Sequence, residues 1–527
     1  MSIPEFQHTS LEAIPGIASA ARGAFRTHRT KTLQWRQTQL RKLYWAVEDY
    51  KPQILEALKK DLHKSDFEAL LTEIDWVKND CLYMLDHLEK FMKDEKLGSP
   101  YVPPTHSFMK FRVKKEPIGT VLIIGPFNFP FQLNLSPLVG AISAGCTVVL
   151  KPSELAPACA MVIKELIEKR LDTSAIAVVN GAVPETTALL NEKWDKIFFT
   201  GSAAVGTIVA KKAAETLTPV VLELGGKNPA FITKNANLAL AAKRLLWGKT
   251  MNAGQVCLSQ NYILIDKDLV QSFITHLNQA YKEMFPNGAK ASPDFGRIIN
   301  QRHFHRIKKM LDNTNGKIVM GGSMDESELF IEPTAVLVNS VDDSMMQEES
   351  FGPVFSIYPV NSLDEALNVA NLVHRTPLSL FTFGSKAENN RILNEMTSGG
   401  ATVNDSFFHA SLISVPFGGV GDSGWGAYRG KASFDAFSHL RTVSETPSWA
   451  EALVAFRYMP FNLSKLKLYS RLTGKKPNFD RNGKVVKGLG YWAGLLFGLG
   501  SKSAKGAFVR WLVVLAAHYL YVTRSGK

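Results

Sequence analysis

Short apolar runs that end in glycine or proline alternate with helical stretches along most of this chain. After a break at Pro100 to Pro104, the first series is FMKFRVKKEPIG, TVLIIG, CTVVLKP, AIAVVNG and KIFFTG, with helical stretches such as PACAMVIKELIEKRL between them. A second series follows Glu223, with ILID, AVLVN and FSIYPV between helices such as VQSFITHLNQAYKEMF. Because helices connect the buried strands of parallel sheets, the pattern predicts an α/β protein with two parallel-sheet lobes.

The chain is long enough to give each lobe its own hydrophobic core. It has 527 residues, of which 45% are hydrophobic, as in ordinary globular proteins. From about Ser10 to Glu95, apolar residues recur with the period of a helix, so helices precede the first sheet. This helical segment carries no obvious chemistry. The four cysteines have no regular spacing and the histidines lack ligand spacing, so we expect neither a disulfide framework nor a metal site.

The net charge of +13 is concentrated at the C-terminal end of the chain. Residues 451–527 hold fourteen basic residues against two acidic ones, which leaves the preceding 450 residues nearly neutral. A neutral body with a basic and apolar tail fits an anionic membrane surface better than a groove for nucleic acid. We therefore expect a membrane or lipid-droplet surface as a partner and no nucleic acid.

The run GAFVRWLVVLAAHYLYV, from Gly506 to Val522, is the apolar part of this tail. As a helix, its seventeen residues would span about 25 Å, slightly less than a hydrocarbon core of about 30 Å. Three interpretations are open: a short membrane anchor at about 506–522, a helix that lies in the interface, and a buried or dimer-packing helix. We expect membrane attachment on the cytosolic side, at the mitochondrial outer membrane, a lipid droplet or the endoplasmic reticulum. The N-terminus shows no secretion signal.

Cys257 and Glu223 stand in contexts that indicate chemistry. Cys257 follows Gly254 and Gln255 in a polar, glycine-containing stretch that interrupts two apolar runs, whereas a structural cysteine usually lies within such a run. Glu223 ends the apolar run PVVLELGG, at the kind of strand end where α/β enzymes place catalytic groups. The two residues together predict a nucleophile and a base. The remaining cysteines, Cys81, Cys146 and Cys159, are expected in the core.

The motif ELGGKNP followed by GQVC is similar to the paired signature of the aldehyde dehydrogenase superfamily. Further blocks resemble the family in the same order, from about Arg22 to about Val443: IIGPFNFPFQLNLSPLVGAISAGCTVVLKPSELAP, PETTALL, FFTGSAAVG, MQEESFGPV and PFGGVGDSGWGAYRGKASFDAFSH. The segments LRKLYWAVEDYKPQILEALKKDLHKSDFEALLTEID and SGGATVNDSFFH point to the class 3 branch and resemble fatty aldehyde dehydrogenases of the fungal type.

This resemblance implies an aldehyde dehydrogenase-like fold with two Rossmann-type lobes, a small oligomerisation arm and, here, a membrane-associated tail. The expected parts are an NAD-binding domain at 10–222 with a β arm inserted at about 100–116, a catalytic domain at 223–430, an oligomerisation arm at 431–450 and the tail at 451–527. The branch also implies a homodimer.

The block FFTGSAAVG predicts the cofactor site. Gly201 and Gly206 bracket a strand-to-helix turn, and backbone N–H groups at such a helix start can hold a pyrophosphate. The resemblance implies contacts to the adenosine ribose from Lys151 and Glu154, and to the nicotinamide half from Glu349 and Phe351. An acid at 154 suits the 2′-hydroxyl of NAD and repels a 2′-phosphate, so we expect NAD, with NADP still open. The expected cofactor residues also include Ser202, Val205, Leu224 and Gly225.

The resemblance also implies roles in the chemistry. The amide of Asn128 and the backbone N–H of Cys257 would stabilise the oxyanion that forms when the Cys257 thiolate attacks an aldehyde. A hydride then passes to NAD, and Glu223 activates the water that hydrolyses the thioester. An acylating relative that uses coenzyme A would not need this glutamate. Phe417 is expected to shape the substrate funnel, with His409 near it.

We therefore expect an NAD-dependent enzyme that oxidises long-chain aliphatic aldehydes to fatty acids. One alternative is the same chemistry on aromatic, short or medium-chain aldehydes. Another is a catalytically silent scaffold or binding protein, which the joint presence of Cys257, Glu223, Asn128 and Glu349 disfavours. By analogy with the fatty aldehyde branch, the run GLGYWAGLLFGLG before the apolar tail would cap the substrate entrance or lie on the bilayer.

Overall fold

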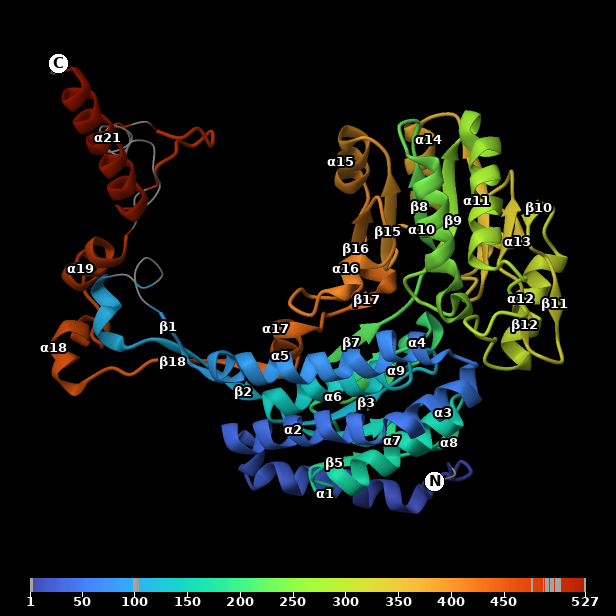
Figure 1. The fold of residues 1–527 in the computed structure, drawn as a ribbon. Helices are drawn as coiled ribbons and strands as arrows, with labels where there is room; N and C mark the ends of the chain where they lie inside the picture. Colours follow the sequence, from blue (N-terminus) through green and yellow to red (C-terminus); the bar gives the residue numbers. More distant parts are fainter. Residues whose placement is uncertain are drawn as a thin grey trace. The chain divides into compact units, whose positions relative to one another are not determined.

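The structure is a computed structural model that describes residues 3–97, 102, 104–474, 477–486, 488, 492, 497 and 504–525. The chain forms two compact units. Unit 1 contains Met1–Glu95 and Val113–Thr442, and unit 2 contains Lys96–Arg112 and Val443–Lys527. Both predicted parallel-sheet lobes are present, and both lie in unit 1 (Figure 1).

The first sheet has six strands in the order β17-β7-β6-β3-β4-β5. Its five parallel strands are β3 (Thr120–Ile124), β4 (Thr147–Lys151), β5 (Ile176–Val178), β6 (Lys196–Thr200) and β7 (Val220–Glu223). The strand order reverses between β3 and β6, and open α/β sheets bind ligands outside the carboxyl ends of their strands at such a point. The run FMKFRVKKEPIG does not join this sheet, because its strand β2 (Arg112–Pro117) pairs elsewhere.

Helices complete the first lobe. The connecting helices are α6 (Gln132–Ala144), α7 (Pro157–Arg170), α8 (Val183–Asn191) and α9 (Ala203–Ala214). Every residue of α6 is buried, which explains why its sequence shows no alternation between an apolar face and a solvated polar face. The helix ends at Gly145, whose φ of +89° is the left-handed conformation that glycine adopts without strain.

The predicted N-terminal helices are confirmed and pack on the first lobe. They are α1 (Ile14–Arg26), α2 (Leu33–Asp49), α3 (Lys51–Leu62), α4 (Asp66–Ala69) and α5 (Asp75–Met92). Apolar residues of these helices share one core with β3, β4 and α6. Between α4 and α5 the chain forms a π-helical turn, Leu70–Ile74, which the regular apolar period did not predict.

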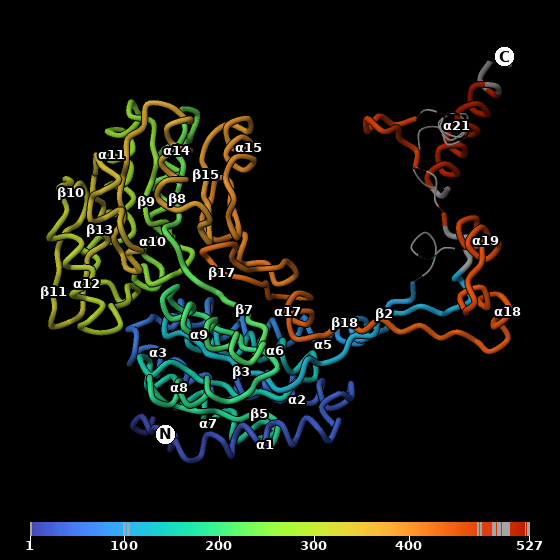
Figure 2. The backbone as a smooth tube through the Cα atoms, turned by 180° about the vertical axis from the view of Figure 1, so that it is seen from behind, coloured from blue at the N-terminus to red at the C-terminus, as the bar shows by residue number. Residues whose placement is uncertain are grey.

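The second sheet has seven strands in the order β10-β13-β14-β9-β8-β15-β16, all parallel except the edge strand β10. The strands are β8 (Asn228–Ile232), β9 (Gln260–Asp266), β10 (Lys317–Met320), β13 (Thr334–Leu337), β14 (Val354–Val360), β15 (Ser379–Phe383) and β16 (Gly400–Val403). Its helices are α10 (Leu238–Thr250), α11 (Val270–Met284), α12 (Gln301–Asp312), α13 (Ser344–Gln347), α14 (Leu363–Val373) and α15 (Lys386–Glu395), and a small hairpin joins β11 (Met324–Asp325) to β12 (Phe330–Ile331). Figure 2 shows this sheet and its helices as a layer separate from the first lobe.

After β16 and α16 (Phe408–Ser411), the chain returns to the first lobe earlier than the expected boundary at 430. Strand β17 (Gly424–Trp425) pairs antiparallel with β7 and places Gly424 opposite Glu223. Helix α17 (Gly430–Ala436) follows and buries Phe434 in the core of the first lobe. The arm is a three-stranded sheet in the order β1-β2-β18, with β1 at Glu95–Lys96 and β18 at Ser438–Val443.

Unit 2 contains α18 (Glu451–Val454), α19 (Leu463–Thr473) and α21 (Ala504–Ser525). Across the part of the chain that the structure describes, no helix has both the length and the apolar character needed to cross a membrane. The anchor expected at about 506–522 is thus not supported as a membrane-spanning segment, although the residues do form a helix. Of the run at 488–500, only residues 488, 492 and 497 are described, so its expected role lies outside the described residues.

Candidate active site

The predicted catalytic residues converge where the two lobes of unit 1 meet. Asn128 follows β3 and Glu223 ends β7, so both lie at the carboxyl edge of the first sheet. Cys257 precedes β9 and Glu349 precedes β14, so both lie at the amino edge of the second sheet. The fold therefore brings together residues that are more than two hundred positions apart in the sequence.

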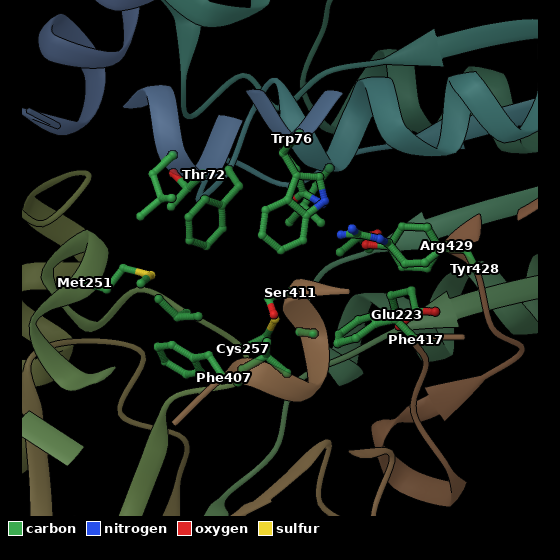
Figure 3. A pocket seen from close by; sticks show the side chains of 18 of the residues that line it. Thr72, Trp76, Glu223, Met251, Cys257, Phe407, Ser411, Phe417, Tyr428 and Arg429 are labelled. Atoms are coloured by element: carbon green, nitrogen blue, oxygen red, sulfur yellow. The ribbon is translucent and has the colours of Figure 1, made fainter. Parts of the chain in front are cut away.

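A cavity of about 510 Å³ contains Cys257 and Glu223 in its wall. Figure 3 shows Thr72 and Trp76 entering it from the α4–α5 segment, opposite Cys257. Aromatic side chains form much of the lining: Trp76, Phe129, Trp247, Phe407, Phe408, Phe417 and Tyr428. A cavity with apolar walls and few polar groups is typical of a site for a small apolar molecule.

Cys257 is partly exposed to this cavity and follows a strained turn. Asn252, Ala253 and Gly254 all have positive φ values, of 50°, 51° and 72°, and strain of this kind clusters at functional sites. The side-chain amide of Asn228 donates to the Cys257 carbonyl at 2.7 Å, which fixes the backbone of the nucleophile. Burial, together with the negative charges of nearby acids, raises the pKa of the Cys257 thiol to about 12. The thiol is therefore neutral in this state.

Glu223 is 4% exposed and lies opposite Gly424 in the antiparallel pair of β7 and β17. Neither of its carboxyl oxygens has a hydrogen-bond partner among the described residues. Burial raises the pKa of Glu223 well above its ordinary value. A buried carboxyl group with two unsatisfied oxygens, beside a thiol in one cavity, has the features of a general base that waits for a water or substrate proton.

Asn128 is buried, and it is held on both sides by the turn before Cys257. The side-chain amide of Asn128 donates to the backbone carbonyl of Gln255 at 3.0 Å. The backbone carbonyl of Asn128 accepts from the side-chain amide of Asn252 at 2.7 Å. Asn128 does not itself line the cavity, whereas its neighbour Phe129 does. Because a primary amide has two N–H donors, one of them remains for an oxyanion.

Glu349 is half-buried and interacts electrostatically with the buried Lys249. Burial raises the pKa of Glu349 to about 7, and burial lowers the pKa of Lys249 to about 7, while each side chain favours the charged form of the other. The Lys249 ammonium donates to the hydroxyl of Ser350 at 3.0 Å. A Cβ at Gly225 would lie 2.4 Å from Glu349 Oε2, so only glycine permits this carboxyl group to lie against the ELGG segment.

The predicted cofactor turn joins β6 to α9. Residues 202–205 are exposed although they follow a buried strand, and Ser202 caps α9 by accepting from Val205 N. A Cβ at Gly201 would lie 2.6 Å from Phe199 and one at Gly206 would lie 2.7 Å from Leu224, so the turn needs both glycines. This open helix start at the carboxyl edge is a ready anion site.

Lys151 and Glu154 lie at the same carboxyl edge as this turn. Lys151 ends β4, and its ammonium contacts Glu154 Oε2 at 2.8 Å. The remaining predicted cofactor residue is Phe351, whose ring meets that of Phe127 edge-on at 5.8 Å.

The two predicted substrate residues differ in position. Phe417 lines the cavity and contacts Tyr428 edge-on. His409 does not line it, although Phe408 and Ala410 do. Its ring nitrogens contact Ser379 Oγ at 3.2 Å and Thr402 Oγ1 at 2.7 Å. The ring therefore anchors α16, which carries Phe408 and Ala410, to strands β15 and β16.

Sequence reasoning missed the contribution of the N-terminal helices and of Arg429. Thr72 and Trp76 line the cavity, and their spacing of four residues matches one helical face, a pattern that equally describes core packing. The Arg429 guanidinium lies 4.2 Å from the centre of the Trp76 ring and 3.7 Å from Asp80. Its Nε and Nη2 have no hydrogen-bond partner among the described residues. No local sequence signal marks either contribution.

Comparison with known proteins agrees with this geometry. Residues 2–443 match the family described as the aldehyde dehydrogenase family. The chain is 67% identical over 521 residues to a Neurospora crassa protein named beta-apo-4'-carotenal oxygenase, covering 99% of this chain and 97% of the relative. It is 40% identical to mouse aldehyde dehydrogenase family 3 member A2, covering 88% and 95%. The solved structure of Staphylococcus aureus AldH in a substrate-bound state is similar with a TM-score of 0.84 at 39% identity, covering 87% and 99%.

Proposed function

This chain belongs to the aldehyde dehydrogenase family, with relatives in its class 3 branch, and on that premise we propose that it oxidises long apolar aldehydes to carboxylic acids. We propose conjugated polyene aldehydes as the substrate class. The observation that carries this proposal is the aromatic cavity with Cys257 in its wall, because flat conjugated chains pack well against aromatic rings. The name of the Neurospora crassa relative, which refers to a carotenal, supports it.

In the proposed mechanism, the sulfur of Cys257 adds to the aldehyde carbon, and the carbonyl oxygen takes on negative charge. The free amide proton of Asn128 and the backbone N–H of Cys257 stabilise this oxygen, at about 3 to 4 kcal/mol per donor. The thiol must lose its proton before or during the attack, since the pKa of Cys257 in the free enzyme is about 12. Glu223 lines the same cavity, and in its ionised form it can accept this proton and pass it to solvent.

Bound NAD or NADP, which is the cofactor of this family, supplies the acceptor for the hydride that leaves the thiohemiacetal carbon. Glu223 then takes a proton from water as the water oxygen attacks the thioester. The carbon–sulfur bond breaks and the acid leaves, and the thiolate of Cys257 takes the proton from Glu223, which regenerates the thiol and the ionised base. The mostly apolar wall of the cavity limits the access of other water to the thioester.

Long-chain saturated aldehydes are the second candidate substrates, because the apolar lining of the cavity accepts an alkyl chain as well. The test is a comparison of kcat/KM for a polyene aldehyde, a saturated aldehyde of matched length and benzaldehyde, followed as NADH formation. We expect the polyene to exceed the saturated chain by about fivefold, the effect of roughly 1 kcal/mol of aromatic contact. Equal or better turnover of benzaldehyde would contradict the proposal, and Cys257→Ser, which should form no NADH, is the control.

We also propose NAD rather than NADP as the preferred cofactor, a homodimer as the assembly, and association of the tail with a membrane or lipid-droplet surface. The carboxylate of Glu154 supports the preference for NAD, because it would repel a 2′-phosphate.

The tail proposal is supported by the basic residues of 451–527 and by the exposed apolar side chains of α21, which include Phe508 and Leu515. The mitochondrial outer membrane, lipid droplets and the endoplasmic reticulum remain the candidate locations.

A further inference from the structure

We propose that the buried ion pair of Lys64 and Glu73 is a clamp that positions Asn128 for the reaction. The inference rests on the oxyanion role proposed above for Asn128. Lys64 follows α3, and Glu73 lies in the π turn between α4 and α5. Neither residue touches the reacting atoms, so both are positioning residues that act through the loop from β3 to α6.

The clamp holds this loop from both sides. Lys64 Nζ lies 2.7 Å from Glu73 Oε1, and neither side chain is exposed at all. Lys64 also donates to the carbonyl of Asn128 at 3.4 Å. The second oxygen of Glu73 accepts from the backbone N–H groups of Phe131 and Gln132, at 3.0 Å and 2.9 Å. The ion pair therefore forms hydrogen bonds to the backbone on both sides of Phe129 and Pro130, at the residue before them and at the residues after them.

The same segment also reaches the turn that precedes the nucleophile. Glu68, in α4, accepts from the backbone N–H of Asn252 at 2.6 Å. The side chain of Asn252 in turn donates to the Asn128 carbonyl at 2.7 Å. The segment that contains Lys64, Glu68 and Glu73 therefore supports both Asn128 and the turn before Cys257. Two donors that stabilise one oxyanion must keep fixed positions relative to each other, and a shared support provides this.

The chemistry of the clamp argues for a role beyond packing. Two charges withdrawn from water are a weak source of stability, and apolar residues of similar volume often serve as well or better. Burial raises the pKa of Glu73, and the Lys64 ammonium opposes that shift, so the carboxylate form of Glu73 is favoured by its partner. Charge-assisted hydrogen bonds to backbone groups are short and directional, which suits the fixing of a loop.

The π turn is a second sign of function. Such turns occur mostly as single insertions within α-helices, frequently at functional sites. In this turn Thr72 lines the cavity while Glu73 points to the loop that carries Asn128. Successive side chains in a π turn are separated by a smaller rotation than in a regular α-helix. This difference lets neighbouring residues of one segment contact the cavity, through Thr72, and the loop, through Glu73.

The test uses the full-length protein with three sets of changes. Lys64→Met and Glu73→Gln each leave a buried charge unpaired and are expected to fold poorly. The double variant K64M/E73Q is neutral, and the glutamine oxygen can still accept from Phe131 and Gln132, so we expect it to fold. The same double change is also made in an Asn128→Ala background. The readouts are the rate of the first turnover of NADH, the affinity for NAD and the thermal midpoint.

We expect K64M/E73Q to slow the first turnover about 10- to 100-fold, because a misplacement of about 1 Å has effects of that size. NAD affinity should change less than about threefold, since the clamp contacts no predicted cofactor residue. In the Asn128→Ala background, the same double change should slow the reaction less than about twofold, because the residue through which the clamp acts is gone.

Two results would overturn the clamp. If K64M/E73Q slows the first turnover by the same factor with and without Asn128, the pair acts on the enzyme generally. If K64M/E73Q folds and reacts at the wild-type rate while Asn128→Ala is slow, the clamp alone is wrong and the oxyanion role stands. A wild-type rate for Asn128→Ala itself would reject the oxyanion role in the proposed mechanism, and the clamp with it.

Discussion

Burial favours the uncharged forms of the acidic groups at and near the cavity, and it keeps the Cys257 thiol neutral in the free enzyme. It raises the pKa values of Cys257 to about 12 and of Glu349 to about 7, and it raises that of Glu223 as well. A neutral thiol is a poor nucleophile, so the free enzyme is protected from oxidation and from reaction with stray electrophiles. The same dry surroundings strengthen the donors that stabilise the oxyanion.

The pH dependence of thiol alkylation tests this account. Below its pKa, the thiolate fraction of a thiol rises about tenfold per pH unit. Because the pKa of Cys257 in the free enzyme is about 12, alkylation by iodoacetamide should rise about tenfold per unit from pH 7 to pH 10 without levelling. A thiol of ordinary pKa would level near pH 9. The rate is measured by mass spectrometry of the Cys257 peptide.

Cys257→Ser is the control, because Cys81, Cys146 and Cys159 are buried and should not be labelled. A plateau below pH 9 would show that the thiol is ionised in the free enzyme. In that case a positively charged group near Cys257, rather than proton transfer to Glu223, would have to stabilise the thiolate.

The residues of the site were predictable where local context marks them. Cys257, Glu223 and Asn128 stand in glycine-containing or turn-forming segments next to strands, and the structure brings them to one place. Lys64 and Glu73 were not predictable, because charged residues in loops and on amphipathic helices usually face solvent. Tertiary packing against the segment that joins β3 to α6 buries them.

The turn before β9 shows how one element places the nucleophile. Gly254 has a φ of +72°, and a Cβ there would lie 2.1 Å from the carbonyl oxygen of Gly352. The turn thus brings the Cys257 segment into close contact with the segment that follows Glu349. Glycine is needed here both for its backbone conformation and for the space.

Gly254→Ala should therefore affect both stability and catalysis. The clash is with backbone atoms, so the two segments must separate, and we expect a loss of about 2 to 4 kcal/mol in stability. We also expect a fall of at least about 100-fold in the first-turnover rate, since the nucleophile moves relative to Asn128. Denaturant unfolding and the NADH burst measure these effects.

Gly288→Ala is the matched control for this substitution. Gly288 has a similar φ of +82° but nothing within 4 Å of a Cβ, so it carries the backbone strain of about 1 kcal/mol without the clash. Equal effects of the two substitutions would mean that backbone strain alone, and not the contact with Gly352, accounts for the loss.

At the same scale, regular elements were easier to predict than exceptions. Most of the inner strands of both sheets are apolar runs because both of their faces are buried, and several of them, such as β3, β4 and β9, are visible in the sequence. The π turn at Leu70–Ile74 and the strand β17 at Gly424–Trp425 escaped prediction. A single inserted residue does not disturb an apolar period visibly, and a two-residue strand is defined by its partner β7 rather than by its own sequence.

Across the whole molecule, chemistry and charge are divided between the two units. Every residue that lines the cavity belongs to unit 1, and most of the net positive charge of the protein lies in residues of unit 2. Helix α21 exposes large apolar side chains along its length, among them Phe508, Leu512 and Leu515. Such a surface is unusual for a monomer in water, and its basic flanks favour an anionic surface.

Removal of residues 504–527 should separate membrane binding from catalysis. We expect the shortened protein to keep its kcat/KM on a water-soluble aldehyde within about twofold, because the cavity lies wholly in unit 1. Binding to anionic vesicles, measured by co-sedimentation, should fall at least about tenfold. Burial of a large apolar side chain contributes about 1.5 to 3 kcal/mol, so the loss of several such side chains exceeds this threshold easily.

The triple variant F508S/L512S/L515S distinguishes apolar insertion from charge attraction, since it keeps every basic residue of the tail. If α21 lies in the interface, this variant should bind vesicles as weakly as the shortened protein at physiological salt. It should recover part of its binding at low salt, where basic residues act over a longer distance. Vesicle binding that is unaffected by both changes would exclude α21 as the attachment site, and the aldehydes would then have to reach the cavity without help from this helix.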